Sequence, residues 1–170
     1  MKIFLIGYRC TGKTTIGKLL ANRLNIDFID TDHLIEQSAD ASILQIVEKQ
    51  GWEKFRHLEK KMLLNTKNMK NSVIATGGGI ILDPDNQQYI KNNGFSIWLD
   101  ADINTILHRL NTDHKTPDSR PSLTDNDLLK ETEDILKQRK PLYEKTADIR
   151  IDTSVVSPEE IVNIIDRRLP

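Results

Sequence analysis

The sequence predicts an α/β fold in which helices wrap a parallel sheet. The main observation is that short apolar runs alternate along the chain with longer segments of helical periodicity. A second is the length of 170 residues, which suits one domain that buries roughly two-thirds of the surface its unfolded chain exposes. The single cysteine, Cys10, cannot form an internal disulfide. We therefore expect one domain over residues 1–170 that folds without covalent cross-links.

The elements follow from this alternation, taken in chain order. The apolar runs predict five strands, at residues 3–6, 28–29, 73–75, 95–99 and 149–151. The segments between and after them predict helices at residues 13–24, 32–37, 43–67, 86–92, 103–110, 128–145 and 158–168. Gly51 is expected to break the third helix. Ligands of such folds gather beyond the carboxyl ends of the strands, so the residues there are the candidates for function.

Charge and hydropathy exclude several classes of partner. The 24 Lys and Arg residues nearly balance 25 Asp and Glu residues, and the net charge is -1. Such a balance gives no electrostatic reason to expect nucleic acid or an anionic membrane. The first apolar run ends at Gly7 and is too short for a signal sequence or a membrane span. We expect a cytoplasmic protein whose partners are small molecules.

A phosphate-binding motif follows the first predicted strand. Residues 7–14 read Gly-Tyr-Arg-Cys-Thr-Gly-Lys-Thr, which matches the Walker A pattern between a strand and a helix. Glycines allow backbone N–H groups to face phosphate oxygens, and Lys13 can reach the β- and γ-phosphates while the Thr14 hydroxyl binds Mg²⁺. The nucleotide is therefore expected to contact Cys10, Thr11, Gly12, Lys13, Thr14 and Thr15. The alternative is an ordinary turn containing glycine, which this sequence context disfavours.

Two carboxylates, Asp30 and Asp32, follow the second predicted strand. A phosphotransferase needs one acidic group near its metal ion and another that orients or deprotonates the attacking hydroxyl. Asp30 suits the first task and Asp32 the second. The alternative is that either residue merely caps the helix that follows.

Arg56 and the glycine run at residues 77–79 are weaker candidates when each is considered alone. The glycines leave room for a ligand to approach the backbone, although a flexible turn has the same pattern. Arg56 can equally be a solvated helix charge. The neighbouring aromatic residues Trp52 and Phe55 can line a pocket or belong to the core.

The order and spacing of these motifs resemble the shikimate kinases over nearly the whole chain. The Arg120-Pro121 segment is similar to that of the subtype with the longer lid. The resemblance implies a P-loop NTPase fold like that of nucleoside monophosphate kinases, with strand order 2-3-1-4-5. The matching segments are residues 7–14, Asp30-Thr-Asp32, Phe55-Arg56, Thr76-Gly-Gly-Gly79, Arg120-Pro-Ser-Leu-Thr124, Arg139-Lys-Pro-Leu-Tyr143 and Asp152-Thr153.

The resemblance also implies roles for individual residues. Arg56 and Arg139 would hold the carboxylate of shikimate, a task for which planar guanidinium groups are well suited. The resemblance implies a substrate-binding helical segment at about 32–62, which contains Asp32 and Arg56. The full substrate-binding set is Asp32, Arg56, Gly77, Gly78, Gly79 and Arg139. Arg120, on a mobile lid at about 111–127, would contact the ATP phosphates. Lys13, Asp32 and Arg120 would be the catalytic residues, and Thr14 and Asp30 would hold Mg²⁺.

The expected reaction is transfer of the γ-phosphoryl group of MgATP to the 3-hydroxyl of shikimate, in aromatic amino-acid biosynthesis. We expect a monomer that binds ATP or ADP and shikimate. One alternative is another small-molecule or nucleoside monophosphate kinase of the same fold, which Asp32, Arg56 and Arg139 disfavour. The other is a regulatory nucleotide-binding module, which a missing Lys13 or a missing carboxylate pair would have supported.

Overall fold

The computed structural model describes residues 1–112 and 127–170 and contains one parallel sheet with strands in the order β2-β3-β1-β4-β5. The predicted strands are all confirmed to within one residue at each end, and so is the strand order. Their bounds are β1 Lys2–Ile6, β2 Asp27–Asp30, β3 Ser72–Ala75, β4 Phe95–Asp100 and β5 Ile149–Asp152.

The predicted helices are confirmed to within two residues at each end. They are α1 Lys13–Leu24, α2 Thr31–Ala39, α3 Ile43–Asn65, α4 Pro84–Asn93, α5 Ile103–Thr112, α7 Leu128–Thr146 and α8 Pro158–Asp166. Gly51 does interrupt α3, with a φ of 80° that favours glycine. Two short 3₁₀ turns, η1 Thr66–Asn68 and η2 Ile80–Leu82, were not predicted as separate elements.

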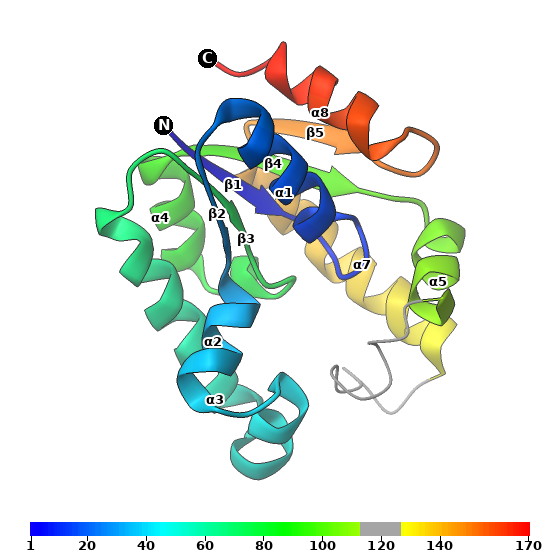
Figure 1. Cartoon of the computed structure of the whole chain (residues 1–170). Helices are drawn as coiled ribbons and strands as arrows, with labels where there is room; N and C mark the ends of the chain where they lie inside the picture. The colour runs from blue at the N-terminus through cyan, green and yellow to red at the C-terminus, as the bar shows by residue number, and fades with distance from the viewer. Residues whose placement is uncertain (113–126) are drawn as a thin grey trace.

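Helices cover both faces of the sheet, so the central strand β1 is apolar on both sides (Figure 1). In β1, Ile3 and Leu5 pack toward the face covered by α1 and α8. The alternate residues Phe4 and Ile6 pack toward residues from α3, α4 and α7 on the opposite face. Among residues 1–112 and 127–170, no helix is both long and apolar enough to cross a membrane.

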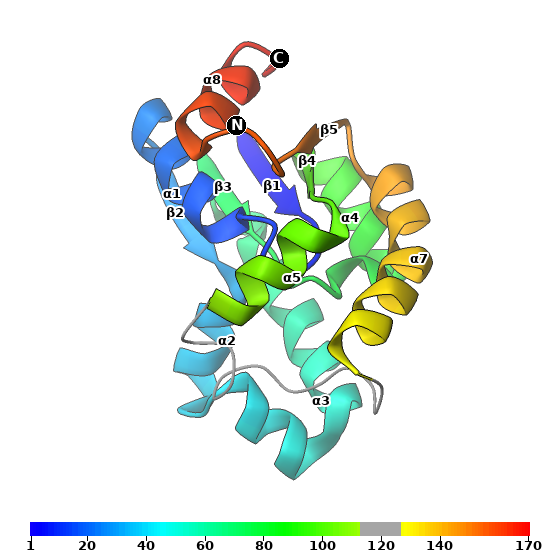
Figure 2. The same ribbon diagram turned by 90° about the vertical axis from the view of Figure 1, so that its right-hand side faces the viewer.

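The carboxyl ends of the strands form the edge of the sheet at which a ligand site is expected. The central strand β1 pairs with β3 on one side and β4 on the other. The strand order therefore reverses direction at β1, and ligands of such sheets bind at this switch point. Both chain termini lie at the end of the molecule away from α2 and α3, as the two views agree (Figure 2). The site edge and the chain ends are thus on opposite sides.

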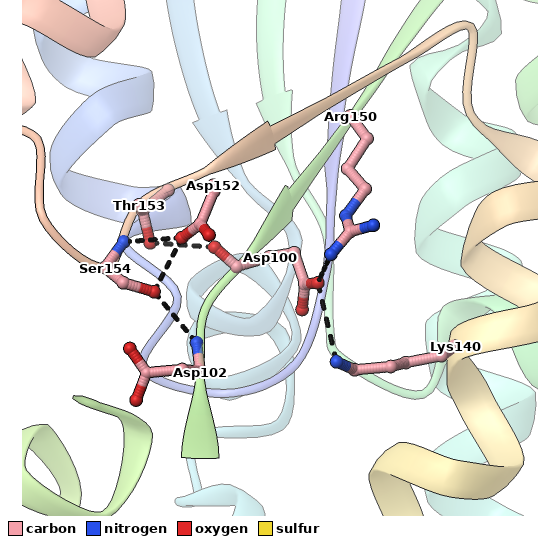
Figure 3. A network of polar contacts seen from close by, with 7 residues as sticks. All are labelled: Asp100, Asp102, Lys140, Arg150, Asp152, Thr153 and Ser154. Carbon is pink, nitrogen blue, oxygen red and sulfur yellow. Dashed lines mark hydrogen bonds and ion pairs between the residues drawn. The ribbon is translucent and has the colours of Figure 1, made fainter. Parts of the chain in front are cut away.

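A polar network fixes the ends of β4 and β5 (Figure 3). The buried Asp100 carboxylate accepts a hydrogen bond from Arg150 at 2.7 Å and forms an ion pair with Lys140 of α7 at 3.5 Å. The backbone N–H of Thr153 donates to the carbonyl of Asp100 at 2.8 Å. Its hydroxyl donates to the carbonyl of Thr11 at 3.2 Å. The network therefore holds the loop after β1 against the rest of the sheet.

Candidate active site

The loop between β1 and α1, residues 7–14, has the backbone shape that a phosphate cradle needs. Gly7 and Gly12 have φ values of 144° and 93°, which residues other than glycine rarely adopt. A Cβ on Gly7 would also overlap the carbonyl of Leu99. Lys13 Nζ donates to the carbonyls of Gly7 and Tyr8 at 2.8 and 2.6 Å. The loop thus holds the Lys13 ammonium group at the N-terminus of α1, where both the positive charge and the helix dipole favour a bound anion.

Asp30 has two roles in the structure. Its Oδ1 caps α2 by accepting hydrogen bonds from the N–H groups of Asp32 and His33 at 3.1 and 3.3 Å, so the capping alternative is correct for this residue. Its Oδ2 accepts a hydrogen bond from the Thr14 hydroxyl at 2.8 Å. A carboxylate and a hydroxyl oxygen therefore adjoin the phosphate loop.

These oxygens fit a hard divalent cation such as Mg²⁺. Within the described part of the chain, no group of three or more His, Cys, Asp or Glu side chains could hold a metal ion. Mg²⁺ commonly takes one or two protein ligands together with waters and substrate phosphates.

A wide cleft of about 1420 Å³, which we call the nucleotide cleft, lies over the phosphate loop. The loop residues in its wall are Cys10, Thr11, Gly12, Lys13, Thr14 and Thr15, the set that the motif predicted. Arg109 of α5 also lines it and was not predicted. Its guanidinium donates to the carbonyls of Cys10 and Thr153 at 3.2 and 2.6 Å, which buttresses the loop. In sequence Arg109 is a single basic residue on a polar helix face, so this contact could not be predicted.

A smaller cavity of about 90 Å³, which we call the acceptor cavity, adjoins the nucleotide cleft. It brings together Asp32, Arg56, Arg139 and the glycine run 77–79, as the sequence predicted. Its lining residues are Tyr8, Arg9, Asp32, Ile43, Trp52, Phe55, Arg56, Glu59, Gly77, Gly78, Gly79 and Arg139. Arg120 and residues 113–126 of the predicted lid lie outside the described residues.

The two predicted arginines are held in place rather than solvated. Arg56 forms an ion pair with Glu59, and its guanidinium carbon lies 5.1 and 5.3 Å from the ring centroids of Trp52 and Phe55. Arg139 is 7% exposed and donates to the carbonyl of Gly78 at 3.1 Å. The aromatic pair both lines the cavity and packs edge to face at 5.8 Å, so both alternatives for it are correct.

The glycine run is a site of close approach and not simply a flexible turn. A Cβ on Gly77 would overlap Glu59 Oε1, and one on Gly79 would overlap the Arg56 guanidinium. The carbonyl of Gly78 accepts hydrogen bonds from Arg139 and from the Tyr143 hydroxyl, the latter at 2.5 Å. Burial raises the pKa of Tyr143, so this hydroxyl keeps its proton and remains a donor.

Glu59 is a site residue that the sequence analysis missed. Its side chain is 1% exposed and pairs with Arg56. Burial raises the pKa of Glu59, although the charges of Arg56 and Arg139 act in the opposite direction. Its Oε1 has no hydrogen-bond partner within residues 1–112 and 127–170. In sequence it is one of many charges on α3, and nothing there reveals its burial.

Comparisons with known proteins agree with this geometry. The family model described as shikimate kinase matches residues 9–170. The chain belongs to the shikimate kinase family. It is 44% identical over 165 residues to the shikimate kinase 2 of Photorhabdus laumondii, covering 96% of this chain and 92% of that relative. It is 42% identical over 174 residues to the shikimate kinase of Syntrophus aciditrophicus, covering 98% and 89%.

Solved structures of the family share the whole fold. The shikimate kinase from Acinetobacter baumannii in complex with shikimate superposes with a TM-score of 0.90 at 33% identity, covering 99% of this chain and 95% of that chain. The shikimate kinase from Aquifex aeolicus superposes with a TM-score of 0.83 at 35% identity, covering 98% and 95%. These matches extend the family assignment to the arrangement of the elements that carry both cavities.

Proposed function

We propose that this protein transfers the γ-phosphoryl group of ATP to the 3-hydroxyl of shikimate, giving ADP and shikimate 3-phosphate for aromatic amino-acid biosynthesis. The observation that carries the proposal is the acceptor cavity, where the guanidinium groups of Arg56 and Arg139 and the carboxylate of Asp32 adjoin a phosphate loop. The resemblance to an Acinetobacter baumannii shikimate kinase described in complex with shikimate supports the choice of acceptor.

The cavity's side chains suit an acceptor that carries both a carboxylate and hydroxyl groups. Arg56 and Arg139 would bind the carboxylate, because guanidinium groups match its two oxygens. Asp32 would orient the 3-hydroxyl and accept its proton as the bond to phosphorus forms. Gly78, where a Cβ would meet nothing closer than 3.4 Å, would leave room for the hydroxylated ring of shikimate beside its backbone.

On the nucleotide side, Lys13 would exchange its carbonyl partners for phosphate oxygens and neutralise their charge. Thr14 and Asp30 would hold Mg²⁺, which when bound supplies positive charge to the β- and γ-phosphates. Arg120 would add a further positive charge, a role that the family resemblance supports. Direct transfer between the two substrates requires no covalent enzyme intermediate.

We also propose that residues 1–170 act as one kinase domain in which the segment 32–62 supplies much of the acceptor site. The position of Asp32, Trp52 and Arg56 around the acceptor cavity supports this. We further propose a monomer that works in the cytoplasm with ATP and shikimate, without nucleic acid or membrane partners. The near-neutral charge of -1 supports the last point.

The test is ADP release by the purified protein with MgATP, with and without shikimate. Gluconate and nucleoside monophosphates serve as competing acceptors of other kinase classes. We expect ADP release that depends on shikimate and yields shikimate 3-phosphate. Turnover with another acceptor only would contradict the assigned roles of Arg56 and Arg139. Tight ATP binding without turnover would indicate a regulatory module instead.

A further inference from the structure

The junction between the two cavities is where phosphoryl transfer must occur, because the two substrates meet there. Four residues line both cavities, namely Arg9, Asp32, Ile43 and Gly78. Two of these carry charge, Asp32 and Arg9. Asp32 already has a proposed role toward the hydroxyl, whereas neither the Walker A motif nor the family resemblance gives Arg9 one.

Arg9 is fixed at this junction from two sides. Its Nη2 forms an ion pair with Oε1 of Glu131, a residue of the first turn of α7 whose side chain is 2% exposed. Its guanidinium carbon lies 5.4 Å from the ring centroid of Tyr8. The side chain of Arg9 is itself only 14% exposed. The guanidinium is therefore preorganised, which is what a group needs if it is to stabilise charge that develops in a reaction.

The Nε of Arg9 is buried and has no hydrogen-bond partner among the described residues. Glu59 Oε1 and the Tyr8 hydroxyl are likewise buried and have no hydrogen-bond partner among the described residues. Both residues line the acceptor cavity. Native proteins rarely leave buried polar atoms unpaired, so a concentration of such atoms around one cavity points to a polar ligand that completes them. Phosphoryl and hydroxyl oxygens can accept from the Nε–H of Arg9.

We propose that Arg9 is a further contact residue for the transferring phosphoryl group, held in position by Glu131. This inference rests on the proposed function, since it assigns a role within phosphoryl transfer. The guanidinium donates its Nε–H to an oxygen of the group as it moves from ADP to the acceptor. Its Nη2 stays on Glu131, which keeps the guanidinium at the junction.

The test compares Arg9→Met with the double variant Arg9→Met/Glu131→Gln. The single variant leaves the Glu131 carboxylate buried without this cation, and we expect a lower Tm. The double variant removes that charge and should regain most of the Tm. Because the phosphoryl contact is absent in both, kcat should stay about 100-fold below wild type in both. The Kd of ATP should change by less than about threefold.

A matched control is Arg23→Met. Arg23 pairs with Asp166 at 3.6 Å, and both side chains are about half exposed, at 48% and 41%. The pair joins α1 to α8 away from both cavities. This variant should keep wild-type kcat. Binding of shikimate 3-phosphate and of shikimate, measured by calorimetry, gives a second readout. Arg9→Met should raise the Kd of shikimate 3-phosphate about tenfold more than the Kd of shikimate.

Recovery of kcat together with Tm in the double variant would show that Arg9 is merely structural and would overturn the proposal. An equal rise in the Kd of shikimate 3-phosphate and the Kd of shikimate in Arg9→Met would also overturn it. The proposed function is judged separately, on wild-type turnover with shikimate. If wild type phosphorylated a different acceptor, the same kcat comparison with that acceptor would decide the role of Arg9. A wild-type protein that phosphorylates no acceptor would contradict both proposals.

Discussion

The nucleotide cleft takes its phosphate-binding groups from consecutive residues, 10–15, whereas the acceptor cavity collects side chains from residues as far apart as 8 and 139. The phosphate loop in the first is a local structure, set by two glycines and the start of α1. The second exists only after α2, α3 and α7 have packed against the glycine run 77–79. The phosphate loop follows from local geometry and the acceptor cavity from the tertiary fold, so the two should respond to different kinds of mutation.

The sharpest separation is expected from Arg139→Ala. Arg139 reaches the carbonyl of Gly78 from α7 and stays nearly buried. Truncating one member of a buried charge arrangement in a binding site costs about 2–5 kcal/mol, so acceptor affinity should fall by roughly 30-fold to 5,000-fold. The Kd of ATP should change by less than about threefold. Titrations with each substrate measure both, and Arg23→Ala is the control. Equal losses for both substrates would indicate a structural role.

A smaller loss is expected from Gly79→Ala. The new Cβ would overlap the Arg56 guanidinium and displace it from its position over Trp52. Because Arg56 is one of two proposed carboxylate ligands, we expect kcat/KM for the acceptor to fall about 30-fold. Gly78→Ala is the comparison, since its Cβ would meet nothing closer than 3.4 Å, and its loss should be smaller. If Gly78→Ala were the more damaging, the close-approach explanation would fail.

The smallest effect is expected from Asp102→Asn, which should leave both cavities intact. Hydrogen bonds from the backbone and hydroxyl of Thr105, and from Ser154, lower the pKa of Asp102 to about 2. The ionised form therefore stabilises the fold above pH 3.8, and this contribution is lost as the pH falls through about 2.

We expect Asp102→Asn to lower Tm by about 1–2 °C at pH 7, with the difference from wild type shrinking between about pH 4 and pH 2. Asparagine can still cap α5, so the variant isolates the charge. Thermal unfolding across this pH range measures the effect. A difference in Tm that grew as the pH fell would contradict the assigned cause. Substrate affinities should remain those of the wild type.

Apolar runs and helical periodicity are local signals, so the strands and helices could be predicted almost completely from them, whereas the strand order was predicted from the family resemblance. The η2 turn was missed because Ile80 to Leu82 follow three glycines, and a 3₁₀ turn of three residues has no periodicity to detect. The phosphate loop was equally accessible, because its chemistry is carried by contiguous residues.

Glu59 and Arg9 were missed for a different reason. Glu59 is surrounded in sequence by other charges on α3, and only packing shows that it is buried beside Arg56. Arg9 occupies a position of the Walker A pattern that accepts any residue, and its partner Glu131 is 122 residues away. Neither burial nor long-range pairing is encoded in local spacing, so these members of the acceptor cavity required the structure.

The position of the chain ends, opposite the edge that carries both cavities, has a practical consequence. Residue 1 precedes β1 on the side of the sheet remote from the phosphate loop, and α8 leads residue 170 to the same side (Figure 2). An affinity tag, a fluorescent protein or a sensor surface joined at either end would leave both openings exposed. Immobilised protein should therefore give the same substrate affinities as protein free in solution, whichever end carries the tether.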